Sequence, residues 1–240
     1  MDALVCVSDG FIYDDVDYGL RIQQRLTAEG LETGRVDLTK SNLDTLPPAR
    51  VYVFTGGETS VNTETAWMRR AVEHAGRLVR TAGAATHSVV GICLGSQIIA
   101  EALRPGSITS LPAMDIGLIR VMGRDGAHGQ ETVPTFHYQA ISPHIESIDG
   151  VRVTWSSPTT PVEGFSYGSA VYGFQFHPEL TSDDMLELIN GRADEIEFRN
   201  GTVADARHSV GRYRDSLSSD LFRRLVVDRC RVGNGMRRVG

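Results

Sequence analysis

Short apolar runs alternate with amphipathic stretches over the first hundred residues of the chain. The apolar runs are rich in β-branched side chains, a composition typical of buried strands, and they cover residues 3–8, 51–57 and 87–93. The stretches between and after them predict helices over residues 16–29, 64–80 and 94–103. Strands that alternate with helices predict an α/β fold with a mostly parallel central sheet and helices on both faces.

After residue 110 the pattern changes to short apolar runs separated by turn residues. These runs cover residues 116–122, 135–141, 151–157 and 170–176. Closely spaced strands without intervening helices favour antiparallel pairing. We therefore expect a smaller antiparallel section next to the parallel sheet.

The C-terminal part of the chain returns to a helical pattern from about residue 182. Leu217, Leu221, Leu225 and Val226 are spaced as one apolar face of a helix. The sequence contains no internal repeat, low-complexity block or linker. We expect a single domain over residues 1–240, with its core at about 1–190 and a helical C-terminal extension at about 191–240.

Composition and charge narrow the classes of function. The net charge of −6 gives no electrostatic support for nucleic-acid binding, and no apolar stretch is long enough to span a membrane. The N-terminus lacks the basic and apolar regions of a signal peptide. An odd number of scattered cysteines and the lack of CxxC or HxxxH spacing predict neither a disulfide framework nor a metal site. We expect a cytoplasmic protein with free thiols and no cofactor.

Cys93 stands between two glycines where an apolar run gives way to a helix. The pattern Gly91-Ile92-Cys93-Leu94-Gly95 is that of a nucleophile elbow, in which small neighbours allow the backbones to crowd together. The N-terminus of the following helix favours a thiolate, and the backbone N–H of Leu94 can join an oxyanion hole. The alternative is a buried cysteine that only packs, which is our interpretation of Cys6 and Cys230.

A base and its orienting acceptor are available in the segment "YGFQFHPEL". His177 follows an apolar run, and Glu179 lies two residues further on, after a proline that fixes the local backbone. A carboxylate at this spacing can bond one ring nitrogen of the histidine and leave the other nitrogen facing a thiolate. We predict a catalytic set of Cys93, His177 and Glu179.

"GICLGSQ" followed by "GFQFHPE" resembles the class I (triad) glutamine amidotransferases, most of all stand-alone proteins related to the amidotransferase domain of GMP synthase. The resemblance covers roughly residues 50–190 and implies the flavodoxin-like fold of that family. It implies that Cys93 attacks the side-chain amide of glutamine to form a thioester, and that His177 protonates the departing ammonia. The segment "FTGG" is similar to the family's oxyanion loop, so the N–H groups of Gly57 and Leu94 are implied as the oxyanion hole.

The same resemblance implies three substrate-binding residues, Gln97, Phe136 and His137. "TFHYQAI" departs from the family where Tyr138 and Gln139 replace glycine and aspartate, and His137 is as well explained by a structural role. Glu58 stands where many relatives have proline. It is interpreted either as a solvated loop charge or as a contact for the α-ammonium group of a substrate.

The sequence contains no ATP-binding loop, so an ammonia acceptor would be handled by a separate protein. The first hypothesis is a glutaminase that feeds ammonia to a partner synthetase. The second is a free-standing γ-glutamyl hydrolase that acts on a glutamyl conjugate by the same thioester chemistry. The third is a non-catalytic regulatory member of the fold, against which the complete Cys, His and Glu set argues.

Overall fold

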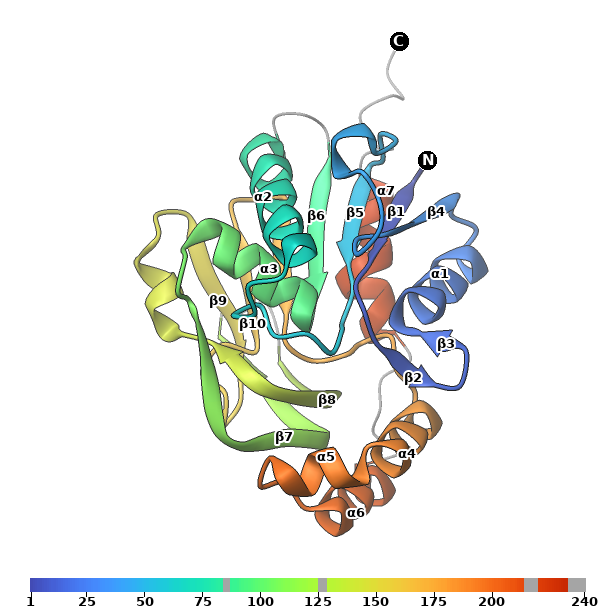
Figure 1. Cartoon of the computed structure of the whole chain (residues 1–240), viewed down its shortest axis with the longest axis vertical. Coiled ribbons are helices and arrows are strands. Elements are labelled where there is room, and N and C mark those ends of the chain that lie inside the picture. Colours follow the sequence, from blue (N-terminus) through green and yellow to red (C-terminus); the bar gives the residue numbers. More distant parts are fainter. Residues whose placement is uncertain (84–86, 125–128, 214–219, 233–240) are drawn as a thin grey trace.

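A large mixed sheet forms the centre of the molecule (Figure 1). In the computed structural model, which describes residues 1–83, 87–124, 129–213 and 220–232, this sheet has nine strands in the order β4-β1-β5-β6-β11-β10-β9-β7-β8. The parallel strands are β4 (Thr33–Asp37), β1 (Ala3–Val7), β5 (Val51–Phe54), β6 (Ser88–Ile92) and β11 (Val171–Phe174). The antiparallel strands are β10 (Gly164–Tyr167), β9 (Val151–Ser156), β7 (Ile108–Gly123) and β8 (Gln130–Ile141).

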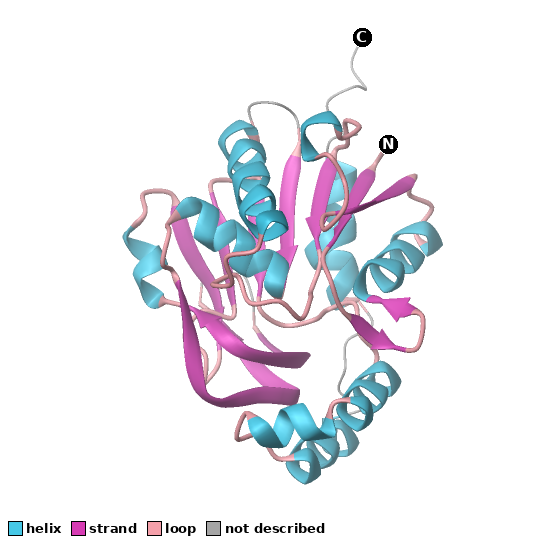
Figure 2. Ribbon diagram, viewed as in Figure 1, coloured by secondary structure: helices cyan, strands magenta, loops and turns pink. Residues whose placement is uncertain are grey.

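Helices cover the sheet and close one end of the molecule, as Figure 2 shows. They are α1 (Tyr18–Ala28), α2 (Ala66–Thr81), α3 (Leu94–Leu103), α4 (Ser182–Gly191), α5 (Ala193–Phe198), α6 (Val203–Tyr213) and α7 (Asp228–Val232). Shorter elements are the turns η1 (Leu43–Thr45) and η2 (Pro143–Ser147), the π-helical turn η4 (Arg223–Val227), and a small hairpin of β2 (Phe11–Tyr13) and β3 (Val16–Asp17). Among the described residues, no helix is both long enough and apolar enough to cross a membrane.

Alternating side chains of the parallel strands build two separate cores. In β1, Leu4 and Cys6 pack on the face covered by α2 and α3, whereas Ala3 and Val5 pack on the face covered by α1. Successive side chains of a strand point to opposite faces, so a continuous apolar run serves both layers. The mostly parallel sheet with helices on both faces, predicted from sequence, is confirmed.

The C-terminal segment completes the second of these cores. Leu221, Leu225 and Val226 are buried with Val5 and α1, and α7 lies behind the sheet in Figure 1. The apolar spacing of these three residues therefore reflects packing against the sheet. Leu217, predicted on the same helical face, lies outside the described residues.

Residues 170–176 differ from the sequence-based prediction, which placed them in the antiparallel section. The structure makes Val171–Phe174 the strand β11, which runs parallel to β6 on one side and antiparallel to β10 on the other. A short buried apolar run does not show the direction of its neighbours. β11 is therefore the junction between the two halves of the sheet, and it leads directly to His177.

Candidate active site

Cys93 lies at a sharp turn between β6 and α3. Its φ of 50° and ψ of −111° place a non-glycine residue in a region of positive φ, which costs about 1–3 kcal/mol. The backbone N–H of Cys93 donates to Phe174 O at 2.7 Å, and that of Gly95 donates to Thr55 O at 2.9 Å. Hydrogen bonds to both neighbouring strands therefore hold the turn in its strained form.

The two glycines of the turn are required by close backbone contacts. A Cβ atom at Gly95 would lie 2.2 Å from Phe54 O, and one at Gly91 would lie 2.5 Å from Gly95 O. Backbone atoms cannot move aside as a flexible side chain can. The crowding expected at a nucleophile elbow is thus present in the structure.

Gly95→Ala should lower the free energy of unfolding by about 1–3 kcal/mol, because the added methyl group overlaps the backbone of β5. Urea unfolding followed by circular dichroism measures this change. Gly211→Ala is the matched control, since its Cβ would meet no atom within 4 Å and alanine favours the helix. Equal stability of Gly95→Ala and the wild type would contradict the tight turn.

His177 and Glu179 form a buried pair next to the turn. His177 Nδ1 lies 2.8 Å from Glu179 Oε1, and the two side chains are 1% and 0% exposed. His177 N donates to Pro134 O at 2.8 Å, while its Nε2 has no hydrogen-bond partner among the described residues. One ring nitrogen is therefore fixed by the carboxylate and the other is free to exchange a proton.

Burial lowers the pKa of His177, but the charges of Glu179 and Cys93 outweigh this effect and raise it to about 10. The imidazole is therefore protonated at neutral pH. A protonated histidine at this position can supply a proton to a leaving group.

The stability difference between the wild type and Glu179→Gln should depend on pH. The pKa of His177 is higher in the folded state than the usual 6.5, so the folded protein binds a proton that the unfolded chain loses above that pH. The ion pair between protonated His177 and the Glu179 carboxylate therefore contributes its full stabilisation below about pH 6.5. This contribution is lost as the pH rises toward 10. Denaturant unfolding of both proteins from pH 6 to pH 10 measures the difference, and a gap that widens with pH would contradict the assignment.

Tyr18 and Gly56 shape the space around the histidine ring, and sequence reasoning missed both. The Tyr18 ring stacks on His177 with 5.0 Å between ring centroids and 24° between planes. A Cβ atom at Gly56 would lie 2.7 Å from His177 Cε1, so glycine leaves room for the imidazole. Tyr18 stands in no motif, and only the packing of α1 brings it to the site. Gly56 belongs to "FTGG", but that motif did not indicate its contact with the imidazole.

Cys93 faces a pocket of about 490 Å³, a volume that includes its open mouth. The residue is 6% exposed, and its sulfur lies 3.8 Å from Phe136 O. Gln97 Nε2 donates to Gln139 O at 3.1 Å, which fixes the amide of Gln97 against β8. The pocket is lined by Tyr18, Gly57, Glu58, Thr59, Cys93, Leu94, Gln97, Met114, Phe136, His137, Tyr138, Gln139, Arg192 and Glu195.

The pocket brings together most of the residues predicted from sequence. Cys93, Gly57, Leu94, Gln97 and the Phe136–His137 segment all line it. The His177–Glu179 pair lies behind them, where the charge of Cys93 acts on the pKa of the histidine. The roles of these residues in binding and catalysis stay predictions.

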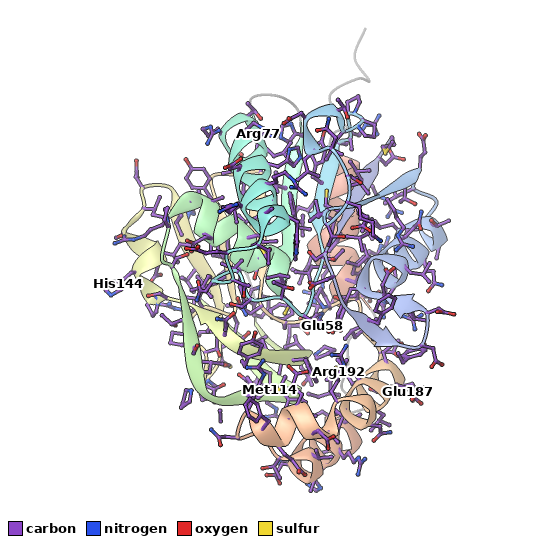
Figure 3. The ribbon with its side chains drawn as sticks, in the orientation of Figure 1. Glu58, Arg77, Met114, His144, Glu187 and Arg192 are labelled. Atoms are coloured by element: carbon purple, nitrogen blue, oxygen red, sulfur yellow. The ribbon has the colours of Figure 1, made fainter. Side chains whose placement is uncertain are left out.

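Glu58 lies in an exposed loop with its side chain 46% exposed, as the interpretation of a solvated loop charge requires, but the carboxylate is paired. It forms an ion pair with Arg192 at the rim of the pocket, and Figure 3 shows the two side chains close together. Arg192 also donates to Phe11 O at 3.2 Å, and the Arg192 hydrogen bond lowers the pKa of Glu58. Arg192 follows α4, beyond the region of family resemblance, so no motif indicated its place in the site.

The loop after β5 is held to the N-terminal part of the chain by Asp9. The backbone N–H groups of Glu58 and Thr59 each donate to Asp9 Oδ1 at 3.2 Å. A Cβ atom at Gly57 would lie 2.5 Å from Asp9 O, so only glycine fits between this loop and the segment after β1. This contact gives the expected oxyanion loop a defined position beside Leu94.

Cys6 and Cys230 differ from Cys93 in their surroundings. Both are buried in the cores, and burial raises the pKa of each thiol to about 12. Neither lines the pocket. Their environments are those of packing residues.

A buried Cys, His and Glu set at the carboxyl edge of a parallel sheet, with the cysteine facing a pocket, is an arrangement suited to thiol-dependent acyl transfer. The sequence model of the glutamine amidotransferase class-I family matches residues 16–191, so the chain belongs to this family. The membership inferred from "GICLGSQ" and "GFQFHPE" is thereby confirmed.

Two curated relatives share part of the sequence. The glutamine amidotransferase-like protein YfeJ of Salmonella typhimurium is 31% identical over 139 residues, which is 55% of this chain and 56% of YfeJ. The glutamine-hydrolyzing GMP synthase of Parafrankia sp. is 35% identical over 101 residues, or 40% of this chain and 18% of that protein. The chain thus spans about half the length of one relative and less than a fifth of the other.

Solved structures share the fold at lower identity. A glutamine amidotransferase from Thermotoga maritima has a TM-score of 0.75 at 19% identity, covering 95% of this chain and 97% of that one. A GMP synthase subunit from Thermoplasma acidophilum has a TM-score of 0.60 at 21% identity, covering 82% and 96%. Both similarities support the architecture described above.

Proposed function

We propose that the chain hydrolyses the side-chain amide of glutamine through a γ-glutamyl thioester on Cys93, and supplies the ammonia to an acceptor enzyme on a separate chain. The observation that carries the proposal is the strained Cys93 turn, which faces a pocket beside the buried His177–Glu179 pair. Membership of the class-I family supports glutamine as the substrate.

In the first half of the reaction, the Cys93 thiolate attacks the amide carbon and the carbonyl electrons move onto oxygen. The N–H groups of Leu94 and Gly57 are the donors proposed for this oxyanion, and one such donor contributes about 3 kcal/mol. As the C–N bond breaks, His177 donates its proton to the nitrogen, so ammonia leaves as a neutral molecule.

In the second half, water attacks the thioester and His177 accepts a proton from it. The C–S bond then breaks to give glutamate and the Cys93 thiolate. Glu179 keeps the imidazole in one orientation through both halves, because its carboxylate holds Nδ1 at 2.8 Å.

The rim of the pocket suits the α-carbon group of free glutamine. Arg192 can face the α-carboxylate, while Glu58 and Glu195 can face the α-ammonium group. Oppositely charged groups at the rim favour a zwitterionic end over a neutral one. We therefore keep the interpretation of Glu58 as a contact for the α-ammonium group of the substrate.

Ammonia release from glutamine by the purified chain tests the proposal, with amine release from γ-glutamyl amines measured alongside. We expect glutamine to be hydrolysed, and the rate to rise when a cognate synthetase is added. The relatives include a glutamine-hydrolyzing GMP synthase, so its synthetase portion is the first partner class to test. Fast hydrolysis of γ-glutamyl amines, with glutamine left intact, would favour the γ-glutamyl hydrolase.

A further inference from the structure

Three buried ionisable side chains from separate segments meet behind the wall of the pocket. Asp115 of β7 pairs in register with His137 of β8, and Glu163 directly precedes β10. One potential ligand atom from each residue lies within 4.8 Å of the other two. His137 is 3% exposed and Glu163 is fully buried. The proposed glutamine chemistry does not use Asp115 or Glu163.

The polar atoms of His137 and Glu163 lack the well-formed hydrogen bonds that buried groups normally have. Neither ring nitrogen of His137 and neither carboxylate oxygen of Glu163 makes a well-formed hydrogen bond to a described residue, although Ser157 and the backbone of Gln139 lie close enough to act on their pKa values. Asp115 Oδ2 accepts from the hydroxyls of Thr159 at 2.6 Å and Thr160 at 3.3 Å. Buried polar groups without partners are rare, and several in one place are normally satisfied by an ordered water, a ligand or an ion.

Burial also disfavours the charged forms of two of the three side chains. Burial and, to a smaller extent, the nearby Asp115 carboxylate together raise the pKa of Glu163 to about 8, against a small lowering by a hydrogen bond from Ser157. Burial lowers the pKa of His137 to about 4, so its imidazole is neutral and can donate a lone pair. Two buried carboxyl groups this close require either a retained proton or a cation.

We propose that Asp115, His137 and Glu163 bind a divalent transition-metal ion, for which zinc is the probe. One imidazole nitrogen and two carboxylate oxygens are a ligand set that suits zinc or manganese better than calcium, which prefers oxygen alone. Ligand atoms around tetrahedral zinc lie about 3.3–3.6 Å apart. The three side chains therefore move together by about an ångström when the ion binds.

The bound ion would fasten the wall of the pocket. β7, β8 and the segment before β10 each supply one ligand, and His137 is adjacent to Phe136, whose carbonyl oxygen lies 3.8 Å from Cys93 Sγ. The ion takes no part in the thiol chemistry. The site thus goes beyond the proposed function, and it differs from the sequence-based expectation of no metal because its ligands come from three segments without a spacing motif.

Metal binding is best measured in a Cys93→Ala background, because zinc can also bind the active-site thiol. The chelator-treated, tag-free chain is equilibrated with zinc, and bound metal is counted by mass spectrometry. We expect about one zinc per chain, and a rise in Tm of about 5–10 °C at a zinc concentration 100-fold above the Kd. Titration with manganese tests whether the site discriminates between the two ions.

Glu163→Gln and Asp115→Asn, each in the same background, keep the shape of the side chain and remove a charged ligand. Both should lose the bound zinc and the rise in Tm, while Glu197→Gln on the exposed surface of α5 should keep them. Zinc binding that persists in both ligand variants would overturn the site. A Cys93→Ala protein that binds no zinc would also overturn the site, and a proton retained on Glu163 would then account for the cluster.

Discussion

Replacing Cys93 by alanine or serine should lower ammonia release from glutamine by at least ~10³-fold while the fold stays intact. The thiolate forms the covalent intermediate, and no other described thiol lines the pocket. The strained turn at Cys93 is costly and is held by hydrogen bonds that its N–H groups donate to carbonyl oxygens at the ends of both neighbouring strands. Such strain is retained where the exposed position of the side chain matters for function.

Steady-state ammonia release and circular dichroism, measured on the same preparations, separate loss of chemistry from loss of fold. Cys6→Ala and Cys230→Ala are the matched controls, because both thiols are buried in the cores. They should keep the turnover of the wild type per folded molecule. Wild-type turnover by Cys93→Ala would show that the thioester mechanism is wrong.

Glu179→Gln should lower kcat for glutamine by about 10²–10⁴-fold, the range contributed by a positioned acid or base. The amide keeps the size of the carboxylate but removes the charge that raises the pKa of His177. The histidine then loses both its fixed orientation and the proton that it gives to departing ammonia. KM should change far less, since Glu179 does not line the pocket.

The matched control for this variant is Glu187→Gln, an exposed glutamate on α4 that Figure 3 labels. It should have the kcat of the wild type. Retention of full activity by Glu179→Gln would mean that His177 is oriented by another group, or that it is not the acid. A rise in KM alone would place Glu179 in substrate binding.

The parallel half of the fold was predictable because its signals are local. The apolar runs of β1, β5 and β6 serve two cores each, and the helices between them carry a clear periodicity. The antiparallel half was predicted only in outline. β10 was missed because Gly164–Tyr167 is short and mixed in polarity, and the direction of β11 depends on its neighbours.

The active site shows the same difference between residues in local sequence motifs and residues brought together only by the fold. Cys93, His177 and Glu179 stand in two short motifs, so their proximity could be predicted without coordinates. Tyr18 and Arg192 reach the pocket through the packing of α1 and the turn after α4, for which no local spacing exists. Asp115, His137 and Glu163 likewise meet only through strand register, which a single sequence does not reveal.

Covalent trapping tests the central claim most directly. A glutamine analogue with an electrophile at the δ position is incubated with the purified chain, and the modified peptide is identified by mass spectrometry. We predict one adduct per chain, on Cys93 alone, and protection by excess glutamine, because the thiolate lies in the pocket beside a cationic histidine. Modification of Cys6 or Cys230 with Cys93 left free, or labelling that glutamine does not slow, would contradict it.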